Sequence, residues 1–344
     1  MWIRRLLVSC MLIIHAAAVL AAFLAPYESA TQHRAFPYAP PTPLRFVDPS
    51  SAWHRRPFVC ATTADETAPD RYAQDCARQY HLRWFVSNDD RPMSGRPEPW
   101  SRHLFGVDPP GAIFLLGTDE YGRDQLSRLL VGAQVSLLAA LLGTTLALGL
   151  AVLAGVLAGY LGGWVDAALT AIGELFLAVP LMYLLLAARA ALPLALGPGD
   201  AFLVMTVLLG LVGWARPFRL VRAVTRTVIA HDYVTAARAL GASTSQIARR
   251  HLVGNVMGVA VTQALVLVPQ FVIAEVTLSF FGLGAAEPMP SWGTMLSAAL
   301  RPHVLSSQPW LLAPVVALIC VSVIYYAVAQ AFRAGILFSA AEKL

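Results

Sequence analysis

The chain has 344 residues, of which 57% are hydrophobic and 13% are charged. A soluble globular domain carries about 25% charged residues, so this composition excludes an ordinary soluble protein and indicates a membrane protein. The formal net charge is +5, but most arginines outside one long loop lie near the ends of apolar segments, where positive charge sets membrane orientation. We therefore expect no nucleic-acid partner.

Six apolar segments are candidates for membrane-spanning helices. A spanning helix needs about 20 mostly apolar residues to cross about 30 Å of hydrocarbon. The pattern therefore predicts an all-α polytopic membrane protein with six transmembrane helices. The predicted spans are residues 6–25, 135–161, 165–192, 201–220, 256–281 and 311–332.

The arginines predict the orientation of these spans. Arg4 and Arg5 precede the first span, which places the N-terminus in the cytoplasm, and six crossings return the C-terminus to the same side. The same count places the loop between the fourth and fifth spans inside, where arginines are concentrated. A cleaved signal peptide is the alternative for the first segment, but its apolar length of about 20 residues favours a retained anchor. The arginines of the loop are Arg216, Arg219, Arg222, Arg226, Arg238, Arg249 and Arg250.

Residues 26–132 form a long polar stretch between the first two spans, on the external side in this topology. Runs such as HLRWFV predict short strands, so we expect a small folded module. Cys60 and Cys76 lie there, in an oxidising compartment, and we predict a disulfide that closes a loop of about 16 residues. The alternative is two free thiols. Cys10 and Cys320 fall within spans and are expected to act as small apolar residues.

A basic segment between the fourth and fifth spans, YVTAARALGASTSQIARRHLVGN, predicts two short helices. Asp232 is expected to cap the first helix, and Gly241 suits the left-handed position that ends it. Ser243 and Gln246 have the spacing of a capping box at the start of the second helix. Small residues on the first helix would let another backbone approach closely, so the segment is suited to docking.

The second helix of this segment is predicted to have two faces. Ile247, Leu252 and Val253 give it an apolar side, whereas Arg249 and Arg250 are expected to face water or lipid headgroups.

This segment resembles the EAA loop of permease subunits in binding-protein-dependent ABC importers. Ala236, Ala237 and Gly241 are in register with that pattern, but Thr235 stands where the glutamate usually lies. The closing Leu-Pro pair is also missing, since Val253 and Gly254 occupy those positions.

Other stretches resemble the dipeptide and oligopeptide branch of the same family, in its second, C-type permease. These stretches are LLGTDEYGRDQLSRLLVGAQVSL, GGWVD, AEVTLSFFGLG and PMPSWGTML, with HLFGV ahead of them resembling members that have an enlarged external loop. Together they cover most of residues 115–335 in the expected order.

The resemblance implies a type I ABC importer permease with an extracytoplasmic insert, in the bacterial cytoplasmic (inner) membrane. The implied partners are P-loop ATPase subunits, a second permease and an extracytoplasmic solute-binding protein. The second permease is expected to be a different chain, although a homodimer is left open. The chain divides into an N-terminal segment with the first helix (1–25), the external module (26–132), a five-helix core (133–335) with the coupling segment at about 229–255, and a cytoplasmic tail (336–344).

In the family the EAA helices seat in grooves on the ATPases, so that closure of the ATPases swings the spans between two states. The residues to which this coupling role is carried over are Thr235, Ala236, Ala237, Arg238, Gly241, Ala242 and Ser243.

Two acidic residues are predicted within spans, Glu174 and Glu275, and Arg189 lies near the outer end of the third. Placing a charged side chain in hydrocarbon costs free energy, so an ionisable residue within a span is first taken to have a function. Because the family delegates solute recognition to an external protein, we favour a structural role. Asp119, Glu120, Arg123 and Asp124 form a charged cluster beside the second span, which we interpret as a capped, ion-paired helix end rather than a metal site.

The sequence offers no catalytic constellation, and we expect no cofactor. No His-Glu-x-x-His or Gly-x-Ser-x-Gly motif is present. Lys343 is the only lysine, and a P-loop needs Gly-x₄-Gly-Lys-[Ser/Thr], so ATP must be hydrolysed in a partner subunit. The alternatives from other classes are a channel or secondary transporter that works without ATP, and a membrane sensor or scaffold.

Overall fold

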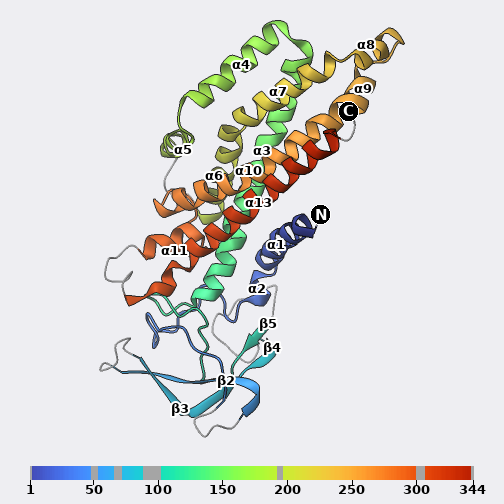
Figure 1. The fold of residues 1–344 in the computed structure, drawn as a ribbon. Coiled ribbons are helices and arrows are strands. Elements are labelled where there is room, and N and C mark those ends of the chain that lie inside the picture. The colour runs from blue at the N-terminus through green and yellow to red at the C-terminus, as the bar shows by residue number, and fades with distance from the viewer. Residues whose placement is uncertain are drawn as a thin grey trace. The chain divides into compact units, whose positions relative to one another are not determined.

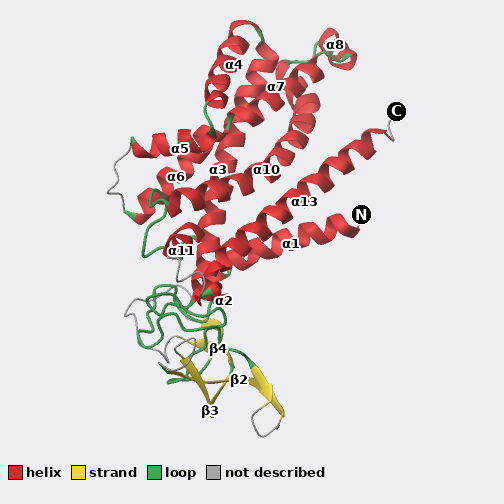
Figure 2. Ribbon diagram, turned by 60° about the vertical axis from the view of Figure 1, so that its left-hand side comes forward, coloured by secondary structure: helices red, strands yellow, loops and turns green. Residues whose placement is uncertain are grey.

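The computed structural model describes residues 2–47, 53–65, 72–87, 102–191, 197–299 and 307–341. The chain forms two compact units, each described by itself. We name Met1–Met11, Leu137–Leu278 and Cys320–Leu344 the helical unit, and Leu12–Ser136 with Ser279–Ile319 the mixed unit. Among the described residues, strands occur only in the mixed unit (Figure 2). The predicted end of the third span at residue 192 and Lys343 lie outside the described residues.

Helices account for most of the chain (Figure 1). In chain order they are α1 (Trp2–Val19), α2 (Ala21–Leu24), α3 (Gln125–Leu161), α4 (Gly163–Ala178), α5 (Leu181–Ala190), α6 (Pro198–Gly213), α7 (Ala215–Ile229), α8 (Asp232–Ala239), α9 (Thr244–Ile247), the π-helix η2 (Ala248–Leu252), α10 (Val253–Phe280), α11 (Trp292–Ala298), the 3-10 helix η3 (Pro309–Leu312) and α13 (Ala313–Ala341).

Four described helical segments are long and apolar enough to cross a membrane, and the number rises to six if two bent pairs each count as one span. All six predicted spans therefore coincide with helix, but the third and fourth are broken. α4 and α5 meet at 90° beside Pro180, which has no backbone N–H to continue a helix. α6 and α7 meet at 41° beside Trp214, whose ring contacts Phe176 and Phe218 at centroid distances of 5.9 and 5.2 Å.

Two glycines let α3 pack closely against α7 in the helical unit. A Cβ added at Gly155 would lie 2.8 Å from the side chain of Val221, and one at Gly159 would lie 2.7 Å from that of Thr225. Glycines four apart on one helix form the small-xxx-small contact by which membrane helices approach. The close contact between α3 and α7 therefore depends on having glycine, which has no side chain, at positions 155 and 159.

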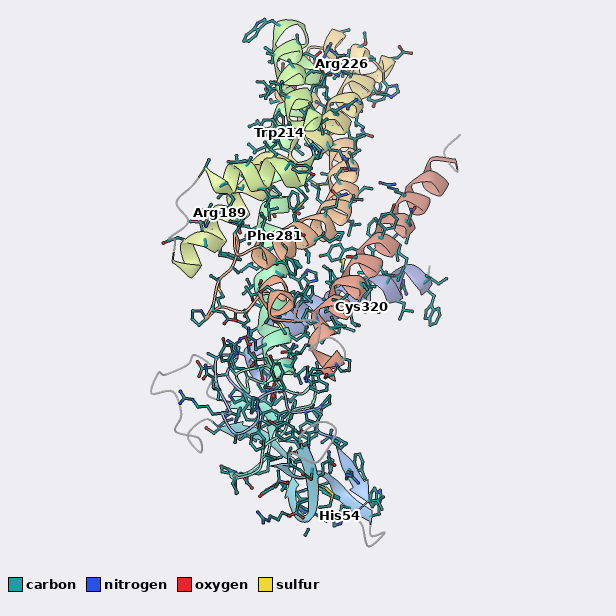
Figure 3. The ribbon with its side chains drawn as sticks, turned by 90° about the vertical axis from the view of Figure 1, so that its left-hand side faces the viewer. His54, Arg189, Trp214, Arg226, Phe281 and Cys320 are labelled. Carbon is teal, nitrogen blue, oxygen red and sulfur yellow. A yellow bond between two sulfur atoms is a disulfide. The ribbon has the colours of Figure 1, made fainter. Side chains whose placement is uncertain are left out.

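An ion cluster joins α4 to α7. Asp166, in the first turn of α4, accepts hydrogen bonds from both Arg222 and Arg226. Arg222 is bidentate, and the bond from its Nη2 measures 2.7 Å. The Asp166 side chain is only 10% exposed, so the two arginines neutralise a carboxylate that is largely shielded from water. Figure 3 shows Arg226 far along α7 from Trp214.

The mixed unit contains two antiparallel sheets. The first has the order β1 (Arg45–Val47), β2 (Trp53–Ala64) and β3 (Tyr72–His81), and the second pairs β4 (Arg83–Ser87) with β5 (Arg102–Gly106). The strands predicted from HLRWFV are confirmed, although Leu82 separates them into two sheets. A disulfide joins Cys60 on β2 to Cys76 on β3. The buried core of the unit is Tyr27, Ala39, Val59, Leu82, Val107, Ile113 and Phe114.

A second ion cluster surrounds the start of α3, as predicted for a capped and ion-paired helix end. Arg123 donates to Asp119 at 2.7 Å and to Glu287 at 3.0 Å, and Arg128 donates to Glu287 at 2.6 Å. Asp124 caps the helix by accepting from the backbone N–H and the hydroxyl of Ser127. No group of three or more metal-binding side chains occurs in the part of the chain that the structure describes.

Burial and charge act in opposite directions on the two carboxyls of this cluster. Desolvation alone would raise the pKa of Glu287, but the hydrogen bonds and charge of Arg128 and Arg123 outweigh it and leave the pKa below its usual range. Desolvation raises the pKa of Asp124 to about 7, because its Ser127 hydrogen bonds only partly offset full burial. Glu287 is therefore an ion-pair partner at neutral pH.

We predict that the disulfide exists in the mature protein. Intact-mass analysis after alkylation under denaturing conditions should find that Cys10 and Cys320 react in the unreduced chain, and all 4 cysteines after reduction. Replacing Cys60 and Cys76 together with serine should lower the free energy of unfolding of the module by about 3 kcal/mol, since the bond closes a loop of medium length. Faster proteolysis between residues 26 and 132 would report that loss. Alkylation of Cys60 and Cys76 without reductant would contradict the prediction.

We also predict that Gly159→Ala lowers the melting temperature of the detergent-solubilised protein. Its Cβ would lie 2.7 Å from Thr225 Cβ and 3.0 Å from the Arg222 carbonyl oxygen, neither of which is a flexible side-chain end. Overpacking of this kind costs about 1–3 kcal/mol. Gly149→Ala is the control on the same helix, because its Cβ would meet no atom within 4 Å. Equal melting temperatures for the two variants would show that the close approach has no energetic weight.

Candidate functional site

The candidate site is the pair of short helices between α7 and α10. α8 begins at Asp232, and its N-cap is His231, whose side chain makes no capping hydrogen bond. The prediction that Asp232 caps this helix is therefore wrong by one residue. His231 has an extended backbone (φ −73°, ψ 144°), and the helical conformation begins at the next residue, so the N-cap is His231 and not Asp232. Asp232 instead lies in the first turn, where a carboxylate stabilises the positive end of the helix dipole.

Gly241 ends α8 in the way the sequence predicts. Its φ of +83° lies in the left-handed region that glycine adopts readily. The N–H of Gly241 donates to the carbonyl of Arg238, and the N–H of Ala242 donates to the carbonyl of Ala237. These two bonds form a Schellman motif, which satisfies carbonyls that a helix end leaves unpaired. The chain therefore reverses at Gly241 with defined geometry.

The predicted capping box of Ser243 and Gln246 is confirmed. The Ser243 N–H donates to the Gln246 amide oxygen at 2.7 Å, and the Gln246 N–H donates to the Ser243 hydroxyl at 3.4 Å. The end of the first helix and the start of the second are thus both capped within five residues. Such caps contribute about 1 kcal/mol each and hold short helices that would otherwise fray.

A small apolar core fastens the helix pair to α7. Val228, Val234, Ile247 and Leu252 are buried together. The predicted inward position of Val253 is wrong, since its side chain is 49% exposed. The turn from Ala248 to Leu252 is π-helical, so residues five apart, Ile247 and Leu252, share one face and the next residue turns outward.

α3 also holds the helix pair, through a residue that the sequence analysis missed. The hydroxyl of Tyr160 donates to the Thr244 hydroxyl at 3.2 Å, and the guanidinium of Arg238 lies 5.5 Å from the centre of the Tyr160 ring. Tyr160 is 84 residues from Thr244 in the sequence, so no local pattern indicates the contact.

The coupling residues carried over from the family lie together on one exposed segment. Ala237 and Ala242 are half-buried, and the others face outward. Leu240, at the C-cap of α8, is 89% exposed, more than any other described large apolar side chain. The exposed members of the set are Thr235, Ala236, Arg238, Gly241 and Ser243. The segment therefore presents small and apolar surface on a rigid support.

The charged residues predicted within spans lie elsewhere in the helical unit. Glu174 is exposed on α4, whereas Glu275 on α10 is 0% exposed and Arg189 on α5 is 2% exposed. A cavity of about 400 Å³ lies where the two broken pairs approach α10, and it is mostly apolar. Its lining includes Pro180, Gly213, Arg216, Gln270 and Phe271.

Comparisons with known proteins identify the family of this chain. Residues 151–337 match the family described as binding-protein-dependent transport system inner membrane component. The oligopeptide transport system permease protein OppC of Escherichia coli (strain K12) is 39% identical over 220 residues, which cover 64% of this chain and 67% of that protein. The dipeptide transport system permease protein DppC of Bacillus subtilis (strain 168) is 35% identical over 202 residues, 59% of this chain and 61% of that protein.

A solved structure of the MetNI methionine ABC transporter in inward-facing conformations is 18% identical, with a TM-score of 0.43, covering 59% of this chain and 95% of that one. The family match covers more than half of this chain. The chain therefore belongs to the family of inner membrane components of binding-protein-dependent transport systems.

Proposed function

We propose that this chain is the C-type permease subunit of an importer for dipeptides, oligopeptides or related small solutes, driven by ATP that partner subunits hydrolyse. The observation that carries the proposal is the doubly capped, exposed helix pair from α8 to η2. Relatives named for oligopeptide and dipeptide transport support the solute class. The single lysine, Lys343, supports ATP hydrolysis in another chain, because a P-loop needs a lysine within its motif.

The proposed topology has six crossings, with each bent pair counted as one span and with both termini in the cytoplasm. Arg4 and Arg5, in the first turn of α1, and the exposed Arg249 and Arg250, in η2, then lie on the cytoplasmic side, in agreement with the positive-inside rule. The module at 26–132 becomes an extracytoplasmic insert ahead of the core at 133–335. An oxidising external compartment suits its disulfide.

We propose that the helix pair docks into a groove on an ATPase subunit through Thr235, Ala236 and Leu240. Coupling requires two global states that the docked partner biases through different contacts. A rigid link can transmit that bias. α8 follows α7 after two residues, and Asp166 ties α7 to α4 through two arginines. Movement of the docked pair would thus shift α7 and α4 together.

A second permease and a solute-binding protein complete the proposed assembly. The second permease is proposed to be a different chain. The cavity beside Pro180 and Gln270 is open to its surroundings and lies where the broken spans meet, which suits a surface that a partner permease completes around the solute. The solute-binding protein would approach from the external side and supply recognition.

The first prediction of this proposal concerns co-purification. A tagged chain, extracted gently from native membranes, should recover P-loop ATPase subunits and a second permease, identified by mass spectrometry. Leu240→Glu should reduce ATPase recovery by tenfold or more, since loss of one apolar anchor from an interface costs roughly 2 kcal/mol. Leu44→Glu, at a leucine that is 41% exposed in the insert, is the matched control and should leave recovery unchanged.

Repeated recovery of the chain alone from several detergents would contradict the importer proposal and favour the channel or sensor alternatives. Equal ATPase recovery with Leu240→Glu and Leu44→Glu would show that Leu240 is not an anchor.

The second prediction concerns the position where the family has glutamate. Thr235→Glu should raise the ratio of substrate-stimulated to basal ATPase activity in the reconstituted importer, because a charged side chain can add a hydrogen bond of about 1.5–3 kcal/mol to the docked state. Ser245→Glu adds the same charge on α9, outside the proposed contact, and should change neither rate. Unchanged basal and stimulated rates in Thr235→Glu would show that position 235 has no special role in coupling.

A further inference from the structure

The β4–β5 hairpin of the mixed unit exposes two consecutive aromatic side chains. Trp84 is 59% exposed and Phe85 is 63% exposed, whereas Val86 is 7% exposed. Neighbouring side chains of a strand point to opposite faces, so a strand on a core normally buries every second one. The backbone of Phe85 is not extended, so this alternation does not hold across it, and Trp84 and Phe85 are both exposed. The hairpin therefore presents two neighbouring aromatic rings to the surroundings.

The backbone of Phe85 is unusual as well. Its φ is +57°, in the left-handed region, which costs an aromatic residue roughly 1–3 kcal/mol. Strain of this kind persists where surrounding structure enforces it, and it often accompanies a functional surface. The register of the hairpin continues past it, from Arg83 opposite Gly106 to Ser87 opposite Arg102. The strained residue therefore interrupts the ladder only at its own position, and the strands keep the same register on both sides of it.

The hairpin is fastened to the end of the first apolar helix. The ring Nδ1 of His103, on β5, lies 2.7 Å from the carbonyl oxygen of Ala25, and both residues are buried. The ring of Phe85 lies 6.2 Å from that of Phe23 on α2. Figure 1 shows β4 and β5 beside α2, with β3 farther away. The exposed rings therefore stay near the residues that end α2.

The length of the apolar segment places those residues in the bilayer. After Arg5 no charged residue occurs until Glu28. About 20 residues from position 6 onward, at 1.5 Å per residue, match the roughly 30 Å of hydrocarbon and end near Ala25. Val19 and Leu20, at the end of α1, are 70% and 41% exposed, so apolar surface continues from the helix toward the hairpin.

We propose that Trp84 and Phe85 insert into the interfacial layer of the outer leaflet and anchor the insert to the lipid surface. The inference rests on the proposed topology. Tryptophan is enriched at the boundary between hydrocarbon and headgroups, where one end of its ring is apolar and the other is wet. Arg102, exposed on β5, can place its guanidinium among the lipid phosphates.

A lipid surface fits this patch better than the solute-binding protein does. The Phe85 ring lies beside Phe23, and His103 on the paired strand contacts Ala25, at the depth where the apolar segment ends. A binding protein approaches from the aqueous side and meets the membrane-distal strands first. Figure 1 shows β2 farther from α2 than β5 is, and His54 of β2 lies at one end of the molecule in Figure 3. Trp53 is the neighbour of His54 in the same strand.

Site-directed spin labelling of the full chain in vesicles of phosphatidylethanolamine and phosphatidylglycerol tests the proposal. The background carries Cys10→Ala and Cys320→Ala, so that one introduced thiol is labelled while the disulfide stays intact. Labels are placed by Trp84→Cys, by Phe85→Cys and, as the control, by Trp53→Cys, whose tryptophan is 67% exposed on the other sheet. Collisions with oxygen report lipid, and collisions with a water-soluble nickel chelate report water.

We expect the ratio of oxygen to nickel-chelate accessibility to be several-fold higher at positions 84 and 85 than at position 53. Ratios at 84 and 85 equal to that at 53 would place the hairpin in water and overturn the proposal. High accessibility to the nickel chelate that falls only when the solute-binding protein is added to the vesicles would also overturn it, in favour of a protein contact.

These outcomes are independent of the importer proposal. A lipid-exposed label in a chain that recovers no ATPase would leave the anchor standing and remove the importer function. A water-exposed label in a chain that recovers ATPases would remove the membrane anchor and leave the importer function standing.

Discussion

The carboxylate of Asp166 is the constraint on which the helical unit depends. A carboxylate that is largely covered by its neighbours is unfavourable unless a cation or a hydrogen-bond donor satisfies it, so Asp166 requires its arginine partners. Two arginines one turn apart on α7, Arg222 and Arg226, both donate to it. The two arginines favour one register of α4 against α7, because only in that register do both of them donate to the same carboxylate. The segment that follows α7 is thereby placed relative to α4 as well.

Packing adds a second link, between α7 and α3. Gly155 and Gly159 let α3 approach α7 over about one turn, and Tyr160, the next residue, reaches Thr244 and Arg238 in the helix pair. The helix pair is therefore attached to α7 at one end, to α10 at the other, where η2 continues into it, and to α3 at its side. An element held at two points transmits displacement better than a loop held at one, which is what a coupling element requires.

Local signals explain what the sequence predicted well. The capping box of Ser243 and Gln246 depends on a spacing of three residues, and Gly241 on a backbone conformation that few residues adopt, so both were visible without a structure. Contacts between distant segments were not: Tyr160 with Thr244 has no local signature. Val253 was misplaced because a π turn moves the apolar face by one residue, and sequence periodicity assumes regular helix. Both bends have a cause in the sequence, since Pro180 stands at the first and Pro217 has no N–H to donate to the carbonyl of Gly213 at the second.

The departures from the family pattern make the exposed surface of α8 less charged and more apolar. Thr235 stands on α8 where the family pattern has a negative charge, while Leu240 presents a nearly fully exposed apolar side chain at the end of that helix. A charged contact draws its strength from hydrogen bonds at fixed geometry, whereas an apolar contact depends on buried area and tolerates small rotations. Docking through Leu240 would therefore keep its affinity while the groove turns during ATPase closure. Salt should weaken such a joint less than one built on an ion pair, since screening acts on charge and leaves apolar burial intact.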